Sequence, residues 1–181
     1  MKTGIEKFKN IVNKKTCDLL IKHFENNINQ SADLDYEDNL NNVICKQLYL
    51  QQRSELDNCV YKSITNVLEK YQKKYPRFKG TGDTGYQLRR ISGTTRQHID
   101  DVFVENTIRT VSIILGLNSD YEKGEFHFPE QKFTTTVKQG EAIIFPVYFL
   151  YPHSVDSPIG YRYTINTWIT TATSVHPLRD A

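Results

Sequence analysis

The feature that most constrains the fold of this chain is a change in sequence pattern near residue 84. Six short runs follow that are rich in Val, Ile, Thr, Phe and Tyr and are separated by Gly, Pro, Asn or Asp. They span Tyr86–Ile91, Thr107–Leu117, Glu125–Phe128, Lys132–Val137, Glu141–Phe145 and Tyr161–Thr171. Because no helical pattern interrupts the runs, we expect residues 84–172 to form an antiparallel sandwich or barrel.

The first 80 residues have a helical pattern instead. Asn13 can cap a helix whose apolar positions recur at helical spacing. These positions are Cys17, Leu20, Ile21 and Phe24. Residues 29–42 are rich in Asn and Asp and show little periodicity, so we expect a loop there, which could serve as a lid.

A second predicted helix begins after Ser54, with Asp57 in the acidic position of an approximate capping box. Its apolar stripe, expected to pack on the sheet, consists of Leu56, Val60, Ile64, Val67 and Tyr71. Pro76 and Gly80 should end it. The chain is therefore expected to be one α+β domain, residues 1–181, in which residues 1–80 buttress the sheet of residues 84–172.

Charge and cysteine content narrow the partners and the compartment. The formal net charge of +2 is too small to favour a nucleic acid or a membrane surface. The three cysteines, Cys17, Cys45 and Cys59, lack the paired spacing of a disulfide framework. No apolar signal segment or bilayer-length stretch is present. We therefore expect a soluble protein in a reducing compartment, the cytoplasm.

His98 and Asp100 form the first half of a candidate metal site. Two residues apart in an extended chain, their side chains turn to the same face and can reach one ion. This spacing also occurs by chance in many proteins. A surface histidine beside an acidic residue is the better explanation of the pair when it is taken alone.

A later histidine and arginine raise the specificity of this pattern. His153 follows the apolar strand that ends near Pro146, and Arg162 opens the last predicted strand. Alternation places Arg162, Thr164, Asn166 and Trp168 on one face of that strand. Because a buried arginine without an anion is costly, Arg162 calls for a carboxylate partner.

Two histidines and one carboxylate around one ion form the facial triad of non-haem iron(II) oxygenases. Three protein ligands leave adjacent coordination positions for a chelating 2-oxo acid and for dioxygen. The planar guanidinium of Arg162 suits the far carboxylate of such an acid, because it can donate two parallel charge-assisted hydrogen bonds. The sequence thus contains every residue type that an iron(II) site with a bound 2-oxo acid requires: His98, Asp100, His153 and Arg162.

These residues resemble the 2-oxoglutarate and iron(II)-dependent dioxygenase superfamily, in particular its prolyl 4-hydroxylase-like branch. Further matching stretches are Arg109–Asn118, Lys123–Pro129 and Gly140–Pro146. The resemblance implies a double-stranded β-helix, or jelly-roll, core that holds Fe(II) in its open mouth, with 2-oxoglutarate and dioxygen as cosubstrates and ascorbate as a candidate reductant.

Carried over to this sequence, the metal ligands are His98, Asp100 and His153, and Arg162 binds the 5-carboxylate of 2-oxoglutarate. Thr164 lies on the same strand face and is a further cosubstrate candidate. Tyr86 could hydrogen-bond the cosubstrate or face the substrate, although simple core packing is an equal alternative. The chain departs from some prolyl hydroxylases in the apolar run 113–115 and in Lys123, which replaces a glycine.

The predicted function is hydroxylation of an unactivated carbon, with a prolyl residue of a peptide or protein as the favoured substrate. The alternatives are a free amino acid or other small molecule as substrate, or a non-catalytic jelly-roll protein that only binds metal. Four arginines could bind a substrate carboxylate or stabilise loops, and the sequence does not separate these roles. They are Arg89, Arg90, Arg96 and Arg109.

Overall fold

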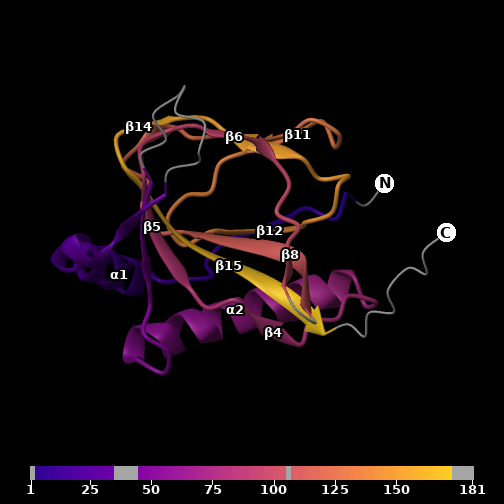
Figure 1. The fold of residues 1–181 in the computed structure, drawn as a ribbon, viewed down its shortest axis with the longest axis horizontal. Helices are drawn as coiled ribbons and strands as arrows, with labels where there is room; N and C mark the ends of the chain where they lie inside the picture. Colours follow the sequence, from indigo (N-terminus) through magenta and orange to yellow (C-terminus); the bar gives the residue numbers. More distant parts are fainter. Residues whose placement is uncertain (1–2, 35–44, 105–106, 173–181) are drawn as a thin grey trace.

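The computed structural model describes residues 3–34, 45–104 and 107–172. Figure 1 shows three layers, with two helices below a large β-sheet and a smaller group of strands above it. The helices are α1 (Lys14–Asn26), the 3-10 helix η1 (Ile28–Gln30) and α2 (Glu55–Lys74). No helix among the described residues combines the length and apolarity of a membrane span.

Fifteen strands supply the β layers of the described chain. They are β1 (Glu6–Phe8), β2 (Ala32–Asp33), β3 (Cys45–Tyr49), β4 (Gly82–Asp83), β5 (Gln87–Ile91), β6 (Thr95–His98), β7 (Phe103–Val104), β8 (Thr107–Gly116), β9 (Glu122–Lys123), β10 (Phe126–Phe128), β11 (Phe133–Thr135), β12 (Ala142–Pro146), β13 (His153–Val155), β14 (Pro158–Ile159) and β15 (Arg162–Ala172). Each of the six predicted strand runs overlaps one of them, and β12 and β15 extend one residue beyond their runs.

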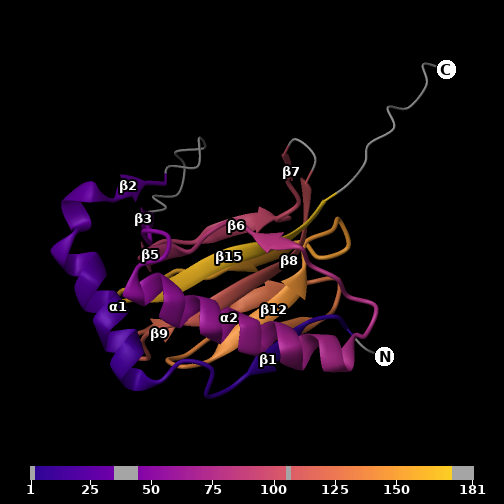
Figure 2. The ribbon, with the colours of Figure 1, turned by 90° about the horizontal axis from the view of Figure 1, so that it is seen from below.

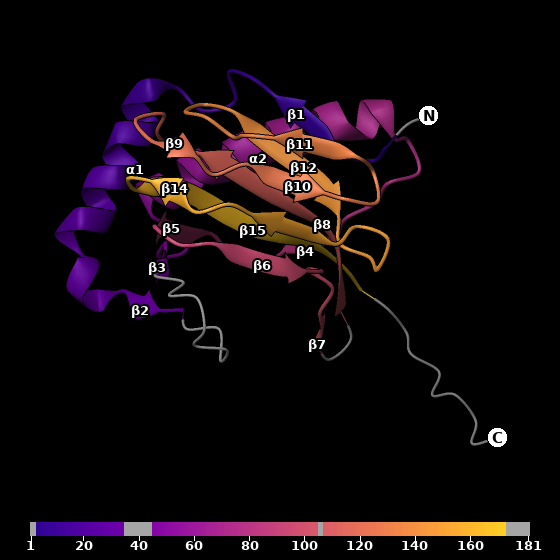
Figure 3. The ribbon, with the colours of Figure 1, turned by 90° about the horizontal axis from the view of Figure 1, so that it is seen from above.

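The large sheet has the order β1-β12-β8-β15-β5-β3-β2, with β4 paired to β15 and β7 to β8. The small sheet has the order β11-β10-β13-β6, and β14 pairs with β9. All of these pairings are antiparallel. Figure 3 shows the small sheet lying across β15 and β8. The expected α+β jelly-roll architecture is confirmed.

Both predicted helices begin where their caps place them. Asn13 Oδ1 accepts a hydrogen bond from the Thr16 N–H at 2.9 Å, and Ser54 Oγ accepts one from the Asp57 N–H at 3.2 Å. The Asp57 carboxylate accepts from the Arg53 N–H and not from Ser54, so only half of the predicted capping box forms. Figure 2 shows α2 lying across the lower face of the large sheet.

Sequence patterns missed three strands in the first 80 residues: β1, the two-residue β2, and β3. β1 pairs with β12 at one edge of the large sheet, and β3 pairs with β5 near the other edge. β1 is only three residues long, and β3 carries Gln47 where a core-facing strand would carry an apolar residue. Of the candidate lid at 29–42, Ala32–Asp33 forms β2, and residues 35–42 lie outside the described part of the chain.

The two faces of the large sheet differ in character. The lower face packs against the apolar sides of both helices in one core cluster. Its strand residues include Leu88, Val111, Ile113, Leu115, Ile144, Ile165 and Ile169. The upper face continues into a second apolar cluster beneath the small sheet, around Phe126, Phe128, Ile143 and Phe145. Part of the same upper face is polar, and it is there that the predicted site residues lie.

Candidate metal and cosubstrate site

His98, Asp100 and His153 converge at the edge of the small sheet. His98 ends β6 and His153 begins β13, and the two residues are direct partners in the register of these strands. Their ring centroids are 4.4 Å apart, and the ligand atoms of all three residues lie within 4.8 Å of one another. The convergence predicted from the sequence is confirmed, although β6 ends at His98 and Asp100 follows in irregular chain.

Both histidines present the same ring nitrogen to the shared point. The Nδ1 atom of His98 lies 2.8 Å from the Arg96 carbonyl oxygen, and the Nδ1 atom of His153 lies 3.2 Å from that of Tyr151. A carbonyl can only accept, so each Nδ1 carries the proton in the neutral ring. The Nε2 lone pairs are then free to bind a cation, and the carbonyls fix the orientation of the rings.

Asp100 completes the donor set as an anion. Its Oδ1 lies 3.2 Å from His98 Nε2, its Oδ2 lies 3.8 Å from His153 Nε2, and Ser112 Oγ donates to Oδ2 at 2.5 Å. Burial by itself would raise the pKa of Asp100, but the neighbouring His98 and His153 side chains and the hydrogen bond from the Ser112 hydroxyl together hold this pKa well below its usual range. The carboxylate is therefore ionised and available to a cation at neutral pH.

The two histidines differ in their surroundings. Burial by itself would lower the pKa of His98, but the hydrogen bond and charge of Asp100 raise it. Burial lowers the pKa of His153, and the charge of Asp100 only partly opposes this effect. His153 is only 3% exposed and its ring lies against Phe128 and Phe145, at centroid distances of 5.4 and 4.7 Å. Neutral imidazole and carboxylate donors on one side of an ion suit iron(II).

Arg162 lies deeper in the same region, at the start of β15. It is 2% exposed, and one of its terminal nitrogens donates to the Gly124 carbonyl oxygen at 3.1 Å. Gly124 has a φ of +77°, a backbone conformation that favours glycine. Arg162 Nε is buried without a partner, and no acidic side chain of the described residues pairs with Arg162. A buried guanidinium in this state fits an incoming carboxylate.

Burial lowers the pKa of Arg162 to about 10, and the charge of Arg89 adds to this effect while Tyr121 and Cys45 oppose it. The guanidinium therefore remains protonated at neutral pH. It can act as a fixed cation for a bound carboxylate.

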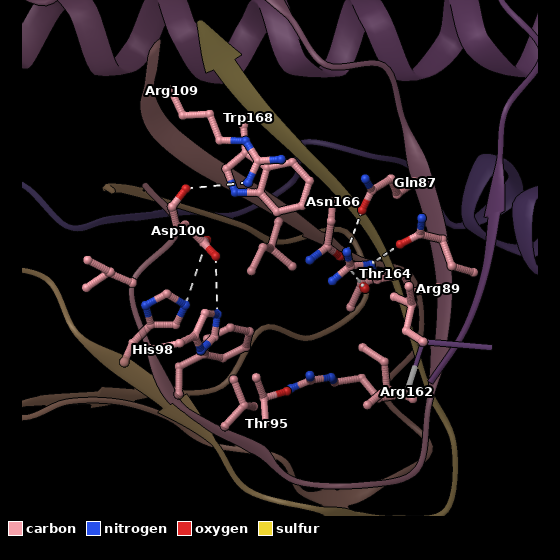
Figure 4. Close-up of a pocket in the computed structure, with 18 of the residues that line it drawn as sticks. Gln87, Arg89, Thr95, His98, Asp100, Arg109, Arg162, Thr164, Asn166 and Trp168 are labelled. Carbon is pink, nitrogen blue, oxygen red and sulfur yellow. Dashed lines mark hydrogen bonds and ion pairs between the residues drawn. The ribbon is translucent and has the colours of Figure 1, made fainter. Parts of the chain in front are cut away.

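A cavity of about 350 Å³ joins the histidine–aspartate cluster to Arg162. Figure 4 shows the labelled residues of both groups around this one space. Four alternating residues of β15 line it, as their spacing predicted: Arg162, Thr164, Asn166 and Trp168. Thr164 is fully buried and its Oγ1 donates to Asn166 Oδ1 at 2.7 Å. The cavity size falls in the lower range of small-molecule sites.

The structure corrects the expectation for Tyr86. Its ring belongs to the core cluster beneath the large sheet, and its hydroxyl donates to Asp83 Oδ2 at 2.9 Å. Side chains alternate between the two faces of a strand. Because Gln87 and Arg89 face the cavity, Tyr86 and Leu88 face the helices. Tyr86 does not line the described cavity, so core packing is its role in this structure.

Sequence patterns did not single out three residues that shape the site. Gln47 and Gln87 line the cavity from β3 and β5, and Ser112 holds Asp100 from β8. Gln87 could have been found, because Gln87 and Arg89 alternate with Leu88 and repeat the pattern that revealed the polar face of β15. His127, which could be mistaken for a ligand, lies outside the cavity and contacts Asp156 Oδ2 at 2.9 Å.

Comparison with known proteins agrees with this geometry. Residues 86–170 match the family model of the 2OG-Fe(II) oxygenase superfamily. No curated protein matches the sequence. Among solved structures, the viral collagen prolyl hydroxylase of Paramecium Bursaria Chlorella virus-1, in its 2OG complex, aligns with a TM-score of 0.71 at 18% identity, covering 93% of this chain and 97% of that chain.

Two further solved structures share the fold. A prolyl-4-hydroxylase of Pseudomonas putida aligns with a TM-score of 0.71 at 13% identity, covering 96% of this chain and 95% of that chain. A prolyl hydroxylase of Trichoplax adhaerens, in complex with a hypoxia inducible factor oxygen degradation domain peptide fragment, aligns with a TM-score of 0.70 at 14% identity, covering 93% and 84%.

The family match includes all four predicted site residues. The donor atoms of the three-residue cluster fit iron(II), the metal of this family. The unpartnered guanidinium of Arg162 in the same cavity fits 2-oxoglutarate, the cosubstrate of this family. The chain therefore carries the domain of the 2OG-Fe(II) oxygenase superfamily, in the fold seen in prolyl hydroxylases, and is a 2-oxoglutarate-dependent dioxygenase.

Proposed function

We propose that this oxygenase hydroxylates a prolyl residue in a peptide or protein. His98, Asp100 and His153 bind the iron, and Arg162 with Thr164 binds 2-oxoglutarate. The fold shared with viral, bacterial and animal prolyl hydroxylases supports the substrate, since one of those proteins is described with a bound peptide fragment.

The observation that carries the chemistry is that one cavity holds both the three-residue cluster and the buried Arg162. When bound, iron(II) supplies a redox-active Lewis acid at which decarboxylation of 2-oxoglutarate and reduction of dioxygen are coupled to hydroxylation of a C–H bond. The protein supplies orientation. The carbonyls behind His98 and His153 fix the ring nitrogens, and Ser112 fixes one oxygen of Asp100.

Arg162 and Thr164 determine how the cosubstrate lies. The guanidinium offers its unpartnered Nε and its remaining terminal N–H groups to the far carboxylate, and Thr164 Oγ1 lies on the same strand face two residues away. Phe126 lies with its ring centroid 5.0 Å from the Arg162 guanidinium carbon and helps exclude water from this end of the cavity. The 2-oxo acid end is thereby directed toward the metal ligands.

The test is mass spectrometry on proline-containing peptides and free amino acids incubated with the protein, iron(II), 2-oxoglutarate and air. We expect the mass gain of one oxygen atom on a peptidyl proline, accompanied by an equal amount of succinate. Omission of iron or of 2-oxoglutarate should abolish both products. Oxygen gain only on a free amino acid would replace the substrate assignment. Absence of both products with every substrate would favour a non-catalytic metal-binding protein.

A further inference from the structure

The structure separates the arginines that the sequence left together. Arg90 points away from the cavity and pairs with Glu25, at 3.2 Å. Arg109 lines the cavity but is engaged, because it donates to the Asp100 carbonyl oxygen and lies over the Trp168 ring at 3.9 Å. Arg89 also lines the cavity, yet no acidic side chain of the described residues forms an ion pair with it. Among the described residues that line the cavity, Arg89 is therefore a cation to which the iron and cosubstrate chemistry assigns no role.

Neutral acceptors hold Arg89 in place. Its Nε donates to Gln47 Oε1 at 2.9 Å, and one terminal nitrogen donates to Gln87 Oε1. The Gln87 amide is itself fixed, because its Nε2 donates to the Tyr49 hydroxyl at 2.7 Å. The guanidinium carbon lies 5.6 Å from the centroid of the Trp168 ring. Two of the five guanidinium N–H donors are used in this way, so the others remain for a ligand.

The charges of the loaded site leave Arg89 without a counterion. If the proposed function holds, divalent iron and Arg162 contribute three positive charges, which Asp100 and the 2-oxoglutarate dianion cancel. Both ligand histidines are neutral in that state. Arg89, which is only partly buried, then adds a further positive charge to the loaded cavity, and no acidic side chain of the described residues compensates it. A substrate that supplies an anion would compensate this charge.

Arg89 shares its cavity with the metal ligands and with the cosubstrate arginine. In the register of the large sheet it stands opposite Gln47 on one side and Thr164 on the other. Arg89 therefore faces the same space as both groups and is distinct from both (Figure 4).

We propose that Arg89 binds a carboxylate of the substrate, so that this oxygenase selects substrates with an acidic group close to the hydroxylated carbon. The inference rests on the proposed function and adds a chemical requirement to it. Two sources share this chemistry: the α-carboxylate of free proline, or the side-chain carboxylate of an acidic residue next to a peptidyl proline. Charge-assisted pairing with the remaining N–H donors provides the selectivity.

The simplest competing role is structural, in which Arg89 only holds two glutamines and a tryptophan in position. Such a role would affect the folded state without distinguishing an acid from its amide. The discriminating measurement is therefore a binding preference between two ligands that differ only in charge. Free L-proline and L-prolinamide form one matched pair. A blocked peptide with Glu beside proline, and the same peptide with Gln, form the other.

Binding is measured by calorimetry without oxygen, on protein loaded with Mn(II) and 2-oxoglutarate, so that the readout does not depend on turnover. The variants are Arg89→Gln, which removes the charge, and Arg89→Lys, which retains it. Arg90→Gln is the matched control, because it lies on the next position of the same strand and faces away from the cavity. Thermal melting of each variant confirms that it is folded.

In the wild-type protein we expect the acid of one pair to bind about tenfold more tightly than its amide, and the pair that shows this identifies the source. Arg89→Gln should reduce the preference to below about twofold, Arg89→Lys should keep part of it, and Arg90→Gln should keep all of it. Equal binding of acid and amide in both pairs, or no binding of either, would overturn the inference.

A preference that survives in Arg89→Gln would also overturn it. If the wild-type protein fails to bind 2-oxoglutarate in the presence of Mn(II), the proposed function fails first, and the inference fails with it. If the protein binds 2-oxoglutarate normally but binds the acid and the amide of each pair equally, only the inference about Arg89 is overturned. The two failures are therefore distinguishable.

Discussion

The two faces of the large sheet are built from the same strands but perform different tasks. On β15, Ile165 and Ile169 pack into the core above the helices, whereas Arg162 and Thr164 line the cavity on the other side. β5 repeats the division, with Leu88 below and Arg89 above. Alternation allows neighbouring residues to contribute separately to stability and to ligand binding. Substitutions on one face should therefore leave the property carried by the other face almost unchanged.

The largest expected effect comes from removing a metal ligand. His153→Ala should lower turnover by about a thousandfold or more, because two donors no longer hold the iron in position. The variant should still unfold cooperatively in a thermal melt. His127→Ala is the matched control, since His127 lies on the neighbouring strand β10 outside the cavity and should be dispensable for turnover. Full activity of His153→Ala would contradict the assignment of His98, Asp100 and His153 as the metal ligands.

The opposite face should show the opposite response. Ile165→Ala removes a fully buried side chain above the helices and should lower the free energy of unfolding by about 2–4 kcal/mol in a denaturant titration. Turnover per folded molecule should remain near the wild-type value. Thr164→Val, one position away on the other face, should weaken 2-oxoglutarate binding with a smaller effect on stability. A reversal of these two results would contradict the separation of the faces.

A smaller effect is expected behind the metal ligands. Ser112→Ala removes the hydroxyl that donates to Asp100 Oδ2, so the carboxylate is held less firmly. The affinity for iron(II) should fall by about tenfold, as measured by metal titration, while saturating iron restores most of the turnover. Ser112→Thr keeps the hydroxyl and should retain more of the affinity. Equal affinities in Ser112→Ala and the wild type would show that the other contacts of Asp100 suffice.

The smallest effect belongs to an edge of the sheet remote from the cavity. Glu141 Oε2 lies 2.7 Å from Lys7 Nζ. Partial burial would raise the pKa of Glu141, but Lys7 and the Lys138 N–H lower it. A lowered pKa stabilises the fold above the unfolded-state pKa, and the gain is lost as pH falls through the folded value. Glu141→Gln should therefore cost about 0.5 kcal/mol at pH 7, and progressively less as the pH falls through the folded pKa, in denaturant titrations, leaving turnover intact.

Several elements of the fold could be predicted because their signals are local. The caps Asn13 and Ser54 and the apolar stripe behind Ser54 define two helices within short stretches of chain. The runs rich in β-branched and aromatic residues gave six strands for the same reason. β1 and β3 were missed because each depends on a distant partner, β12 and β5, and neither carries an apolar pattern of its own.

The candidate site shows the same limit. The side chains of Arg162 and Thr164 could be assigned to one face of their strand, because a polar face in an otherwise apolar strand is visible in the sequence. Tyr86 was assigned to the wrong face because the sequence does not show which face of β5 is turned toward the cavity. The role of Ser112 depends on the distance between two strands that are far apart in the sequence, and no local pattern reports such a distance.

The sequence by itself determined the chemistry of this protein, since the residue types and their order restricted the site to two imidazoles, a carboxylate and a guanidinium. The tertiary structure decided which charges are compensated. Arg90 finds Glu25 from α1, whereas Arg89 meets two glutamine side chains and no acid among the described residues. Pairing of charges depends on contacts between segments that the fold brings together, and the energy of each charge depends on its burial.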